Sequence, residues 1–305
     1  MSEERRVEKS EKNMINNIPK RPPWIRGKIS WDENSGKVRD LLKELNLNSV
    51  CVDAACPNRG ECWGKRHVTF MILGRNCTRR CGFCNVAGKS PEGPDTAEPA
   101  RIARAVSELG LKYVVITSVT RDDLSDKGTG QFVRTVKEIK AKDPGVLVEL
   151  LIPDMGADPD LLRETAFSGA KVVGHNMEMP ESLYPAIRPE ADYGRSLQTL
   201  ALLKKQNPDI AVKSAIIAGL GETKKEIIRT IEDLRDVGVD ILYMGQYLSP
   251  SVDHWPVKKY YTPGEFRALE EEARRKGFKT VSSGPMVRSS FRAHESYLAF
   301  KGPRS

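Results

Sequence analysis

Apolar runs that alternate with helical runs begin at Thr69, and this alternation constrains the fold more than any other feature of the chain. The apolar runs have the length and β-branched content of buried strands; they are TFMIL, YVVIT, VLVELLI, KVVGH, AVKSAIIAG, DILYMGQYL and KTVSS. Helical periodicity fills the gaps between them, from PARIARAVSELG to PGEFRALEEEARRKG. Gly110, Gly169, Gly238 and Gly277 each follow a helical run, which is where glycine commonly ends a helix.

Strand–helix alternation predicts a parallel sheet whose strands are joined by right-handed crossovers. About six such units favour a full or partial barrel over an open doubly wound sheet. We therefore expect an α/β fold, a partial (β/α)6 barrel of the TIM type with an N-terminal extension and a C-terminal segment. A chain of 305 residues, 39% of them hydrophobic, suffices for one core of this size.

The composition of the sequence also predicts how the chain is divided into segments. Residues 1–18 are rich in charge and poor in apolar side chains, which predicts a disordered tail. Residues 19–68 are expected to form an N-terminal extension with a helix over KVRDLLKELNL, anchored to the body through Trp24. The barrel is expected over 69–283, and the C-terminal segment over 284–305.

All six cysteines of the chain fall between positions 51 and 84, in two triplets. The upstream triplet, spaced C-x4-C-x5-C, consists of Cys51, Cys56 and Cys62. The downstream triplet, spaced C-x3-C-x2-C, consists of Cys77, Cys81 and Cys84. Three thiolates can hold three irons of a cubane iron–sulfur cluster and leave the fourth iron open to another ligand. The two triplets therefore predict two clusters, each short of one cysteine.

Disulfides and zinc are the alternative interpretations of these cysteines. Disulfides belong to oxidising compartments and concentrate in small secreted domains, whereas this chain shows no apolar signal segment. A closed zinc site takes four ligands, commonly as two pairs, and His67 is the only histidine near the triplets. Iron–sulfur clusters fit the spacing better than either alternative.

Polar residues at the strand ends predict where the active site lies. In a barrel, the loops at the carboxyl ends of the strands build it, and the downstream triplet follows the first strand. The polar residues at later strand ends are expected to line the same mouth; they are Thr117, Ser118, Arg121, Asp122, His175, Asn176, Glu178, Lys213, Ser214, Gln246 and Tyr247.

The charge balance favours acidic partners. Lys and Arg number 49 against 41 Asp and Glu, which gives a net charge of +8. The positive charge is spread along the chain, without basic residues interleaved among aromatics, so a nucleic-acid partner is not expected. No run is apolar enough to predict a membrane span, and we expect a cytoplasmic protein.

The downstream triplet, with Phe83 directly before Cys84, resembles the radical S-adenosylmethionine (SAM) superfamily. KSAIIAGLGET resembles the superfamily's glycine-containing stretch near SAM. The resemblance implies that the open iron binds SAM and that one electron cleaves SAM to a 5′-deoxyadenosyl radical, which abstracts hydrogen from unactivated carbon. The residues expected to contact SAM are Thr117, Asn176, Glu178, Lys213, Gly219 and Glu222.

Further motifs resemble the lipoyl synthase family from about Lys20 to Ala293. They are RPPWIRGK, CVDAACPNRGECWG, TSVTRDDLSDKG, ELLIPD, HNMEMPESLYPAIRP, QYLSPS and GPMVRSSFRA. In that family the last motif supplies a serine as the fourth ligand of an auxiliary 4Fe–4S cluster, and the matching position is Ser290. Phe291 stands where the family usually has tyrosine, so this chain keeps the ring and lacks the hydroxyl at that position.

The resemblance implies a sulfurtransferase that inserts sulfur at carbons 6 and 8 of a protein-bound octanoyl group. It implies two 4Fe–4S clusters, with the auxiliary cluster as the sulfur donor, and two SAM molecules per lipoyl group. The catalytic residues would be Cys77, Cys81, Cys84 and Ser290. The implied partners are an octanoylated lipoyl carrier domain or glycine-cleavage H protein, a reductant such as ferredoxin or flavodoxin, and an iron–sulfur carrier that rebuilds the spent cluster.

Three other functions fit the sequence less well. An enzyme similar to biotin synthase does not account for the upstream CPNxxECW triplet. A tRNA-methylthiolating enzyme would need an additional RNA-binding domain, for which the chain is too short. A ferredoxin-like electron carrier would not need the long stretch that follows Cys84. Cleavage of SAM would separate the enzymes from the carrier.

Overall fold

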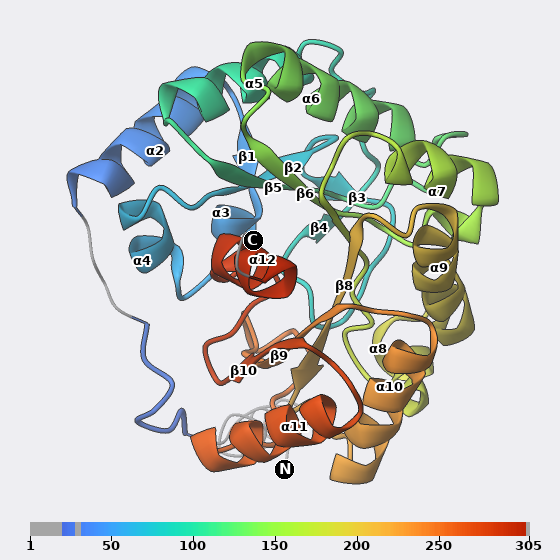
Figure 1. Ribbon diagram of the computed structural model, residues 1–305. Coiled ribbons are helices and arrows are strands. Elements are labelled where there is room, and N and C mark those ends of the chain that lie inside the picture. Colours follow the sequence, from blue (N-terminus) through green and yellow to red (C-terminus); the bar gives the residue numbers. More distant parts are fainter. Residues whose placement is uncertain (1–19, 28–31, 303–305) are drawn as a thin grey trace, which may run out of the picture.

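The computed structural model describes residues 20–27 and 32–302 and shows an α/β fold around one eight-stranded sheet (Figure 1). The tail predicted over residues 1–18 lies outside the described residues. The strands of the sheet, in spatial order, are β1 (Asn48–Ser49), β2 (Thr69–Ile72), β5 (Tyr113–Ser118), β6 (Leu147–Leu151), β7 (Val172–Gly174), β8 (Ala211–Ala218), β9 (Ile241–Gln246) and β10 (Thr280–Gly284).

The sheet has the connectivity of a partial barrel. Each strand from β2 to β10 pairs in parallel with its neighbour in that order, and only β1 joins in the antiparallel sense. Within the described ranges no pairing joins β10 back to β1, so the sheet stays open on that side. The predicted parallel sheet and partial TIM-type barrel are confirmed, and each of the seven predicted strands is present.

Helices cover the outer face of the sheet, as Figure 1 shows. They are α5 (Glu98–Glu108), α6 (Thr129–Lys142), α7 (Pro159–Ala166), α9 (Tyr193–Gln206), α10 (Lys224–Asp236) and α11 (Pro263–Arg275), with the shorter α8 (Tyr184–Ile187) after β7. Thr223 and Thr262 start α10 and α11 with capping boxes closed by Glu226 and Glu265. Among the helices of the described chain, none combines the length and the apolar character needed to cross a membrane.

Both faces of the eight-stranded sheet are buried. Side chains alternate across a strand, so Val114 and Ile116 of β5 pack into the large core beneath the outer helices. Tyr113 and Val115 point the other way, into a smaller cluster inside the barrel. Tyr243 of β9 belongs to the same inner cluster. The barrel interior is therefore packed at one end with side chains and is not a pore.

The N-terminal extension and the C-terminal segment meet at the open side of the sheet. The extension carries α2 (Glu33–Glu44), α3 (Val50–Asp53) and α4 (Arg59–Gly64). The C-terminal segment ends in α12 (Ala293–Lys301), which lies inside the ring of outer helices in Figure 1. Its Tyr297 contacts the Tyr113 ring, with centroids 6.1 Å apart, so α12 closes the inner cluster.

Two glycines allow the close approaches that hold these end segments. A Cβ on Gly27 would lie 2.4 Å from the Pro57 carbonyl oxygen, and one on Gly245 would lie 2.1 Å from the Val287 oxygen. A side chain at either position would push the segments apart. Trp24 donates from Nε1 to the Tyr261 carbonyl oxygen at 3.2 Å, which confirms the predicted anchor of the extension.

Candidate active site

Both cysteine triplets face one cavity of about 510 Å³, the mouth cavity, at the carboxyl ends of the parallel strands. Ser118, Leu151 and Gln246 end β5, β6 and β9, and all three line it. This is the end of a parallel barrel at which catalytic loops gather. Five of the cysteines contribute to its wall: Cys51, Cys56, Cys77, Cys81 and Cys84.

The downstream triplet lies on a loop between two very short strands. Cys77 ends β3 (Asn76–Cys77), which pairs in parallel with β4 (Ala87–Gly88), and Cys81 and Cys84 lie on the loop between them. Burial raises the pKa of Cys84 to about 12, with the neighbouring thiols adding to the rise. Burial also raises the pKa of Cys81, partly offset by Arg188. These groups are therefore thiols at neutral pH and release protons when a metal binds them.

Arg188 lies beside this loop, and the sequence pattern did not single it out. Its Nη1 donates to the Met177 carbonyl oxygen and to the Tyr184 hydroxyl, both at 3.0 Å. Its Nε is buried and has no hydrogen-bond partner among the residues that the structure describes, and the side chain lines the mouth cavity. A buried cation with an unused donor beside Cys81 can receive an anionic group of a ligand.

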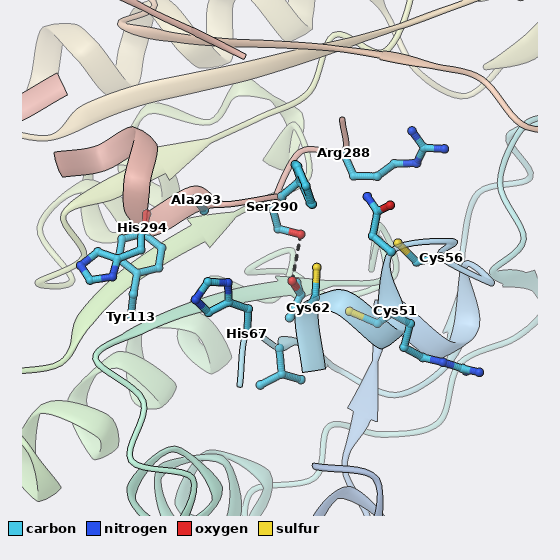
Figure 2. Close-up of a pocket in the computed structure, with 14 residues that line it drawn as sticks. Cys51, Cys56, Cys62, His67, Tyr113, Arg288, Ser290, Ala293 and His294 are labelled. Carbon is cyan, nitrogen blue, oxygen red and sulfur yellow. Dashed lines mark hydrogen bonds between the residues drawn. The ribbon is translucent and has the colours of Figure 1, made fainter. Parts of the chain in front are cut away.

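The upstream triplet surrounds a second, smaller cavity of about 40 Å³, shown in Figure 2. Cys51 belongs to α3 and Cys62 to α4, and Cys56 lies in the turn between these helices. Ser290 of the C-terminal segment reaches the same cavity from the opposite side. The predicted set of three cysteines and one serine is thus brought together in space.

Ser290 is held in place by the start of the barrel. Thr69, the first residue of β2, donates from Oγ1 to the Ser290 hydroxyl at 2.9 Å. Asn58 donates from Nδ2 to the Met286 carbonyl oxygen at 2.6 Å, which ties the turn of the upstream triplet to the same segment. Burial, followed by the charges of the neighbouring cysteines, raises the pKa of Cys62 to about 12.

The donor set of each site fits an iron–sulfur cluster. Three thiols with a hydroxyl, or three thiols beside an open cavity, supply soft ligands for iron and leave one position different. Within residues 20–27 and 32–302, no three histidine, cysteine or carboxylate side chains form a group that holds a single metal ion. All six cysteines are free thiols.

Three residues predicted to contact SAM line the mouth cavity: Thr117, Asn176 and Glu178. Asn176 donates from Nδ2 to the Glu178 carboxylate at 3.1 Å, and burial raises the pKa of that carboxylate. Glu178 also has a φ of +65°, a backbone strain that residues at functional sites often carry. The polar groups on this wall are therefore fixed before any ligand arrives.

The other three predicted SAM contacts, Lys213, Gly219 and Glu222, do not line this cavity. Lys213 donates to Glu149 at 2.7 Å inside the barrel and lies 4.1 Å from the centre of the Tyr243 ring. Glu222 accepts three backbone N–H groups, from residues 219–221, at 2.7 to 3.0 Å. Its carboxylate thus shapes the turn that follows β8.

The remaining strand-end residues divide in the same way. Ser118, His175, Gln246 and Tyr247 line the mouth cavity with the residues named above. Arg121 pairs with Asp123 at 2.8 Å, Asp122 pairs with Arg79 at 2.7 Å, and Ser214 accepts the Met177 N–H at 3.2 Å. Of these three contacts, the pair of Asp122 with Arg79 joins two loops, whereas Arg121 pairs within its own loop and Ser214 binds from β8.

The Radical SAM superfamily profile matches residues 71–234, more than half of the chain. A lipoyl synthase from Alkaliphilus metalliredigens is 47% identical over 279 residues, covering 92% of this chain and 96% of its own length. A lipoyl synthase from Rubrobacter xylanophilus is 45% identical over 275 residues, covering 90% of this chain and 86% of its own. The similarity therefore spans both triplets and the barrel.

Solved structures share the fold at low identity. A methylornithine synthase structure aligns with a TM-score of 0.54 and 17% identity, covering 81% of this chain and 74% of that one. SuiB from Streptococcus suis, bound to S-adenosylmethionine, aligns with a TM-score of 0.55 and 13% identity, covering 77% of this chain and 55% of that one. At these identities the likeness supports the fold alone.

Proposed function

Because the chain belongs to the lipoyl synthase family of the radical SAM superfamily, we propose that it makes the lipoyl cofactor by inserting two sulfur atoms into a protein-bound octanoyl group, at carbons 6 and 8. Radical SAM chemistry requires a 4Fe–4S cluster and SAM. We assign this cluster to Cys77, Cys81 and Cys84, on the loop that faces the mouth cavity. When bound, the cluster and SAM supply a 5′-deoxyadenosyl radical that removes hydrogen from unactivated carbon.

A second 4Fe–4S cluster, held by the upstream triplet and Ser290, completes the proposal as the sulfur donor. The support is the small cavity that all four side chains line, together with the Thr69 hydrogen bond that fixes the Ser290 hydroxyl. Oxygen is a harder ligand than thiolate and suits iron–sulfur chemistry less well. Ser290 would therefore be the weakest of the four ligands and would leave the cluster more readily than a thiolate.

The strongest support for the proposed function is that residues of both cysteine sites line the same mouth cavity. Cys51, Cys56 and Ser290 of the upstream site line it together with all three cysteines of the downstream triplet. A carbon radical formed inside this cavity is thus enclosed with the proposed sulfur source. Reacting groups held in one enclosed space react far faster than groups that must meet in solution.

The proposed SAM contacts form two groups, those that line the mouth cavity and those that do not. Thr117, Asn176 and Glu178 are assigned to SAM directly, since they line the cavity beside the downstream triplet. Gly219 and Glu222 are assigned through the turn that they shape after β8. Lys213 completes the proposed set, and contact with SAM would require its Nζ to leave Glu149.

The proposed organisation and partners follow from the same assignment. Residues 19–68 carry the donor ligands, 69–283 the radical-generating barrel, and 284–305 the segment with Ser290. The octanoylated substrate is proposed to be a lipoyl carrier domain or H protein, with ferredoxin or flavodoxin as reductant and an iron–sulfur carrier for repair. A cytoplasmic setting is part of the proposal, because cysteines that ligate clusters must be kept reduced and disulfides are rare in that compartment.

The test compares two variants in which one triplet at a time is changed to alanine. After anaerobic reconstitution the parent should hold about eight irons per chain, and each variant about half of that. We expect the downstream variant to lose SAM cleavage. The upstream variant should keep cleavage but make no lipoyl product from an octanoyl-lysine peptide, as measured by mass spectrometry. Equal loss of SAM cleavage in both variants would contradict this division of roles.

A further inference from the structure

Arg79, between the first two cysteines of the downstream triplet, makes a double fork of hydrogen bonds. Its Nε and Nη2 donate to the Asp122 carboxylate at 2.7 and 2.9 Å. Its Nη1 and Nη2 donate to the Asp154 carboxylate at 2.7 and 2.9 Å. The Arg79 side chain is only 6% exposed. Bidentate pairing of this kind fixes direction as well as distance.

The two carboxylates belong to different parts of the barrel mouth. Asp122 follows β5, and Asp154 follows β6. The Asp154 side chain is fully buried and also receives Arg195 Nε at 3.1 Å and the Gly156 N–H at 3.1 Å. The position of the Asp154 carboxylate is therefore fixed by several contacts, and Arg79 links the cysteine loop to this carboxylate.

Backbone hydrogen bonds hold the loop on either side of this fork. The Thr78 N–H donates to the Thr120 carbonyl oxygen at 3.1 Å. Beyond Cys81, the Gly82 N–H donates to Ile187, and the Gly82 carbonyl oxygen accepts the Trp255 N–H, both at 2.8 Å. The stretch between Cys77 and Cys81 thus has one deeply buried charged anchor, which is Arg79.

We propose that Arg79 is a positioning residue, which holds the downstream cysteine loop in the shape that its cluster and SAM require. This inference rests on the proposed function. Arg79 acts through Asp122 and Asp154, so it sets the spacing of Cys77 and Cys81 without binding iron itself. A lysine in its place keeps the charge but cannot hold two carboxylates in a planar fork.

Arg80 provides a matched control, because it is the same residue type in the same loop but is exposed. The experiment compares Arg79→Lys with Arg80→Lys in a chain whose upstream triplet is changed to alanine, so that one cluster gives the signal. The measurements are iron per chain, the electron paramagnetic resonance (EPR) spectrum of the reduced cluster with and without SAM, and the rate of SAM cleavage. The unfolding midpoint of the metal-free chain is measured alongside.

For Arg79→Lys we expect SAM cleavage per bound cluster to fall by about tenfold or more, because small misplacements of reacting groups cost large factors in rate. The EPR change caused by SAM should be weakened or lost in the same variant. Arg80→Lys should stay within about twofold of the parent in both measurements, since exposed substitutions usually have small effects.

Asp122→Asn guards against the possibility that Arg79→Lys fails to fold, since the Asp122 side chain is 41% exposed. It keeps the shape of one arm of the fork but removes its charge, and we expect a weaker change of the same kind. An EPR response to SAM that is normal in both variants would overturn the proposal, even if their unfolding midpoints fell. Absence of a cluster and of SAM cleavage in the parent would instead overturn the proposed function.

Discussion

At the scale of single residues, the serine that faces the upstream triplet gives the sharpest test of the site. Ser290→Ala removes the only oxygen among the four proposed ligands and leaves the Thr69 hydroxyl without its acceptor. We expect the variant to keep the downstream cluster and SAM cleavage but to lose at least about tenfold in lipoyl product, because the second cluster lacks a ligand.

Ser289→Ala is the control for the neighbouring position, since Ser289 lines the mouth cavity but not the small cavity of the upstream triplet. Iron content, SAM cleavage and product mass are measured for both serine variants. Full sulfur insertion by Ser290→Ala would remove that residue from the ligand set.

His175 predicts a pH dependence of stability. Burial, aided by the charge of Arg188, lowers its pKa to about 4, and its Nδ1 lies 3.0 Å from the Ile152 carbonyl oxygen. In the unfolded chain a histidine has a pKa of about 6.5, so the unfolded state binds the proton first as the pH falls. The stability that depends on neutral His175 is therefore fully present above about pH 6.5 and is lost progressively between about pH 6.5 and 4.

The expected loss across this window is roughly 3 kcal/mol of unfolding free energy, measured by urea denaturation of the metal-free chain. His175→Asn places an amide near the Nδ1 position but does not titrate, so it should flatten the profile within the window. A slope unchanged by the substitution would assign the pH dependence to other groups.

At the scale of elements, α12 closes the inner end of the barrel, and substitutions on its buried and exposed faces should destabilise the protein to very different degrees. Tyr297 is 6% exposed and contacts the Tyr113 ring, whereas the neighbouring Leu298 is 45% exposed. Tyr297→Ala should cost about 3 kcal/mol of unfolding free energy, because it leaves a cavity where an aromatic ring was buried. Leu298→Ala should cost less than about 0.5 kcal/mol.

Urea denaturation of the two α12 variants measures both values. Tyr297→Ala should also lower the iron held at the upstream site, because α12 begins just after Ser290. Equal destabilisation by the two substitutions would mean that α12 does not seal the barrel through Tyr297.

The strands and outer helices were predictable because their signals are local. Apolar runs, helical periodicity and terminal glycines such as Gly110, with its φ of +62°, each act over a few residues. By contrast, β1 and β3 have two residues each and are too short to produce a periodic pattern. The packing of α12 inside the barrel depends on contacts with distant strands, which no local pattern contains.

The site was predictable to a similar degree. The spacing of the cysteines identified the two triplets. The motif resemblance added Ser290, which is far from them in the sequence but lines the same small cavity as the upstream triplet. The pattern did not indicate how far along its strand each polar residue lies. Lys213 is the third residue of β8 and therefore lies toward the closed end, where it pairs with Glu149. Arg79 and Asp154 form a pair only after folding, because nothing in either local sequence points to the other.

At the scale of the whole molecule, the net charge of +8 predicts how the carrier protein is captured. Complementary charge speeds the encounter of a basic protein with an acidic domain, and salt screens it over about 8 Å at physiological ionic strength. We expect the affinity for an octanoylated acidic carrier to fall as salt rises from about 0.05 to 0.3 M, while SAM cleavage alone changes little.

Binding of the carrier at several salt concentrations, with cleavage assayed in parallel, measures this effect. A short octanoyl-lysine peptide without acidic residues is the matched control and should bind with little salt dependence. An affinity for the carrier that does not change with salt would mean that the basic excess takes no part in recognition.

The hydrogen bond between Thr69 and Ser290 joins residues 221 positions apart in the chain. At about 5–20 residues per second, a ribosome needs on the order of ten to forty seconds to travel that distance. Throughout this interval, the upstream triplet has already been synthesised, but the segment with Ser290 that covers its thiols has not. Soft metal ions and oxidants can reach them in this state, so correct loading with iron and sulfide depends on the order of events during synthesis as well as on affinity.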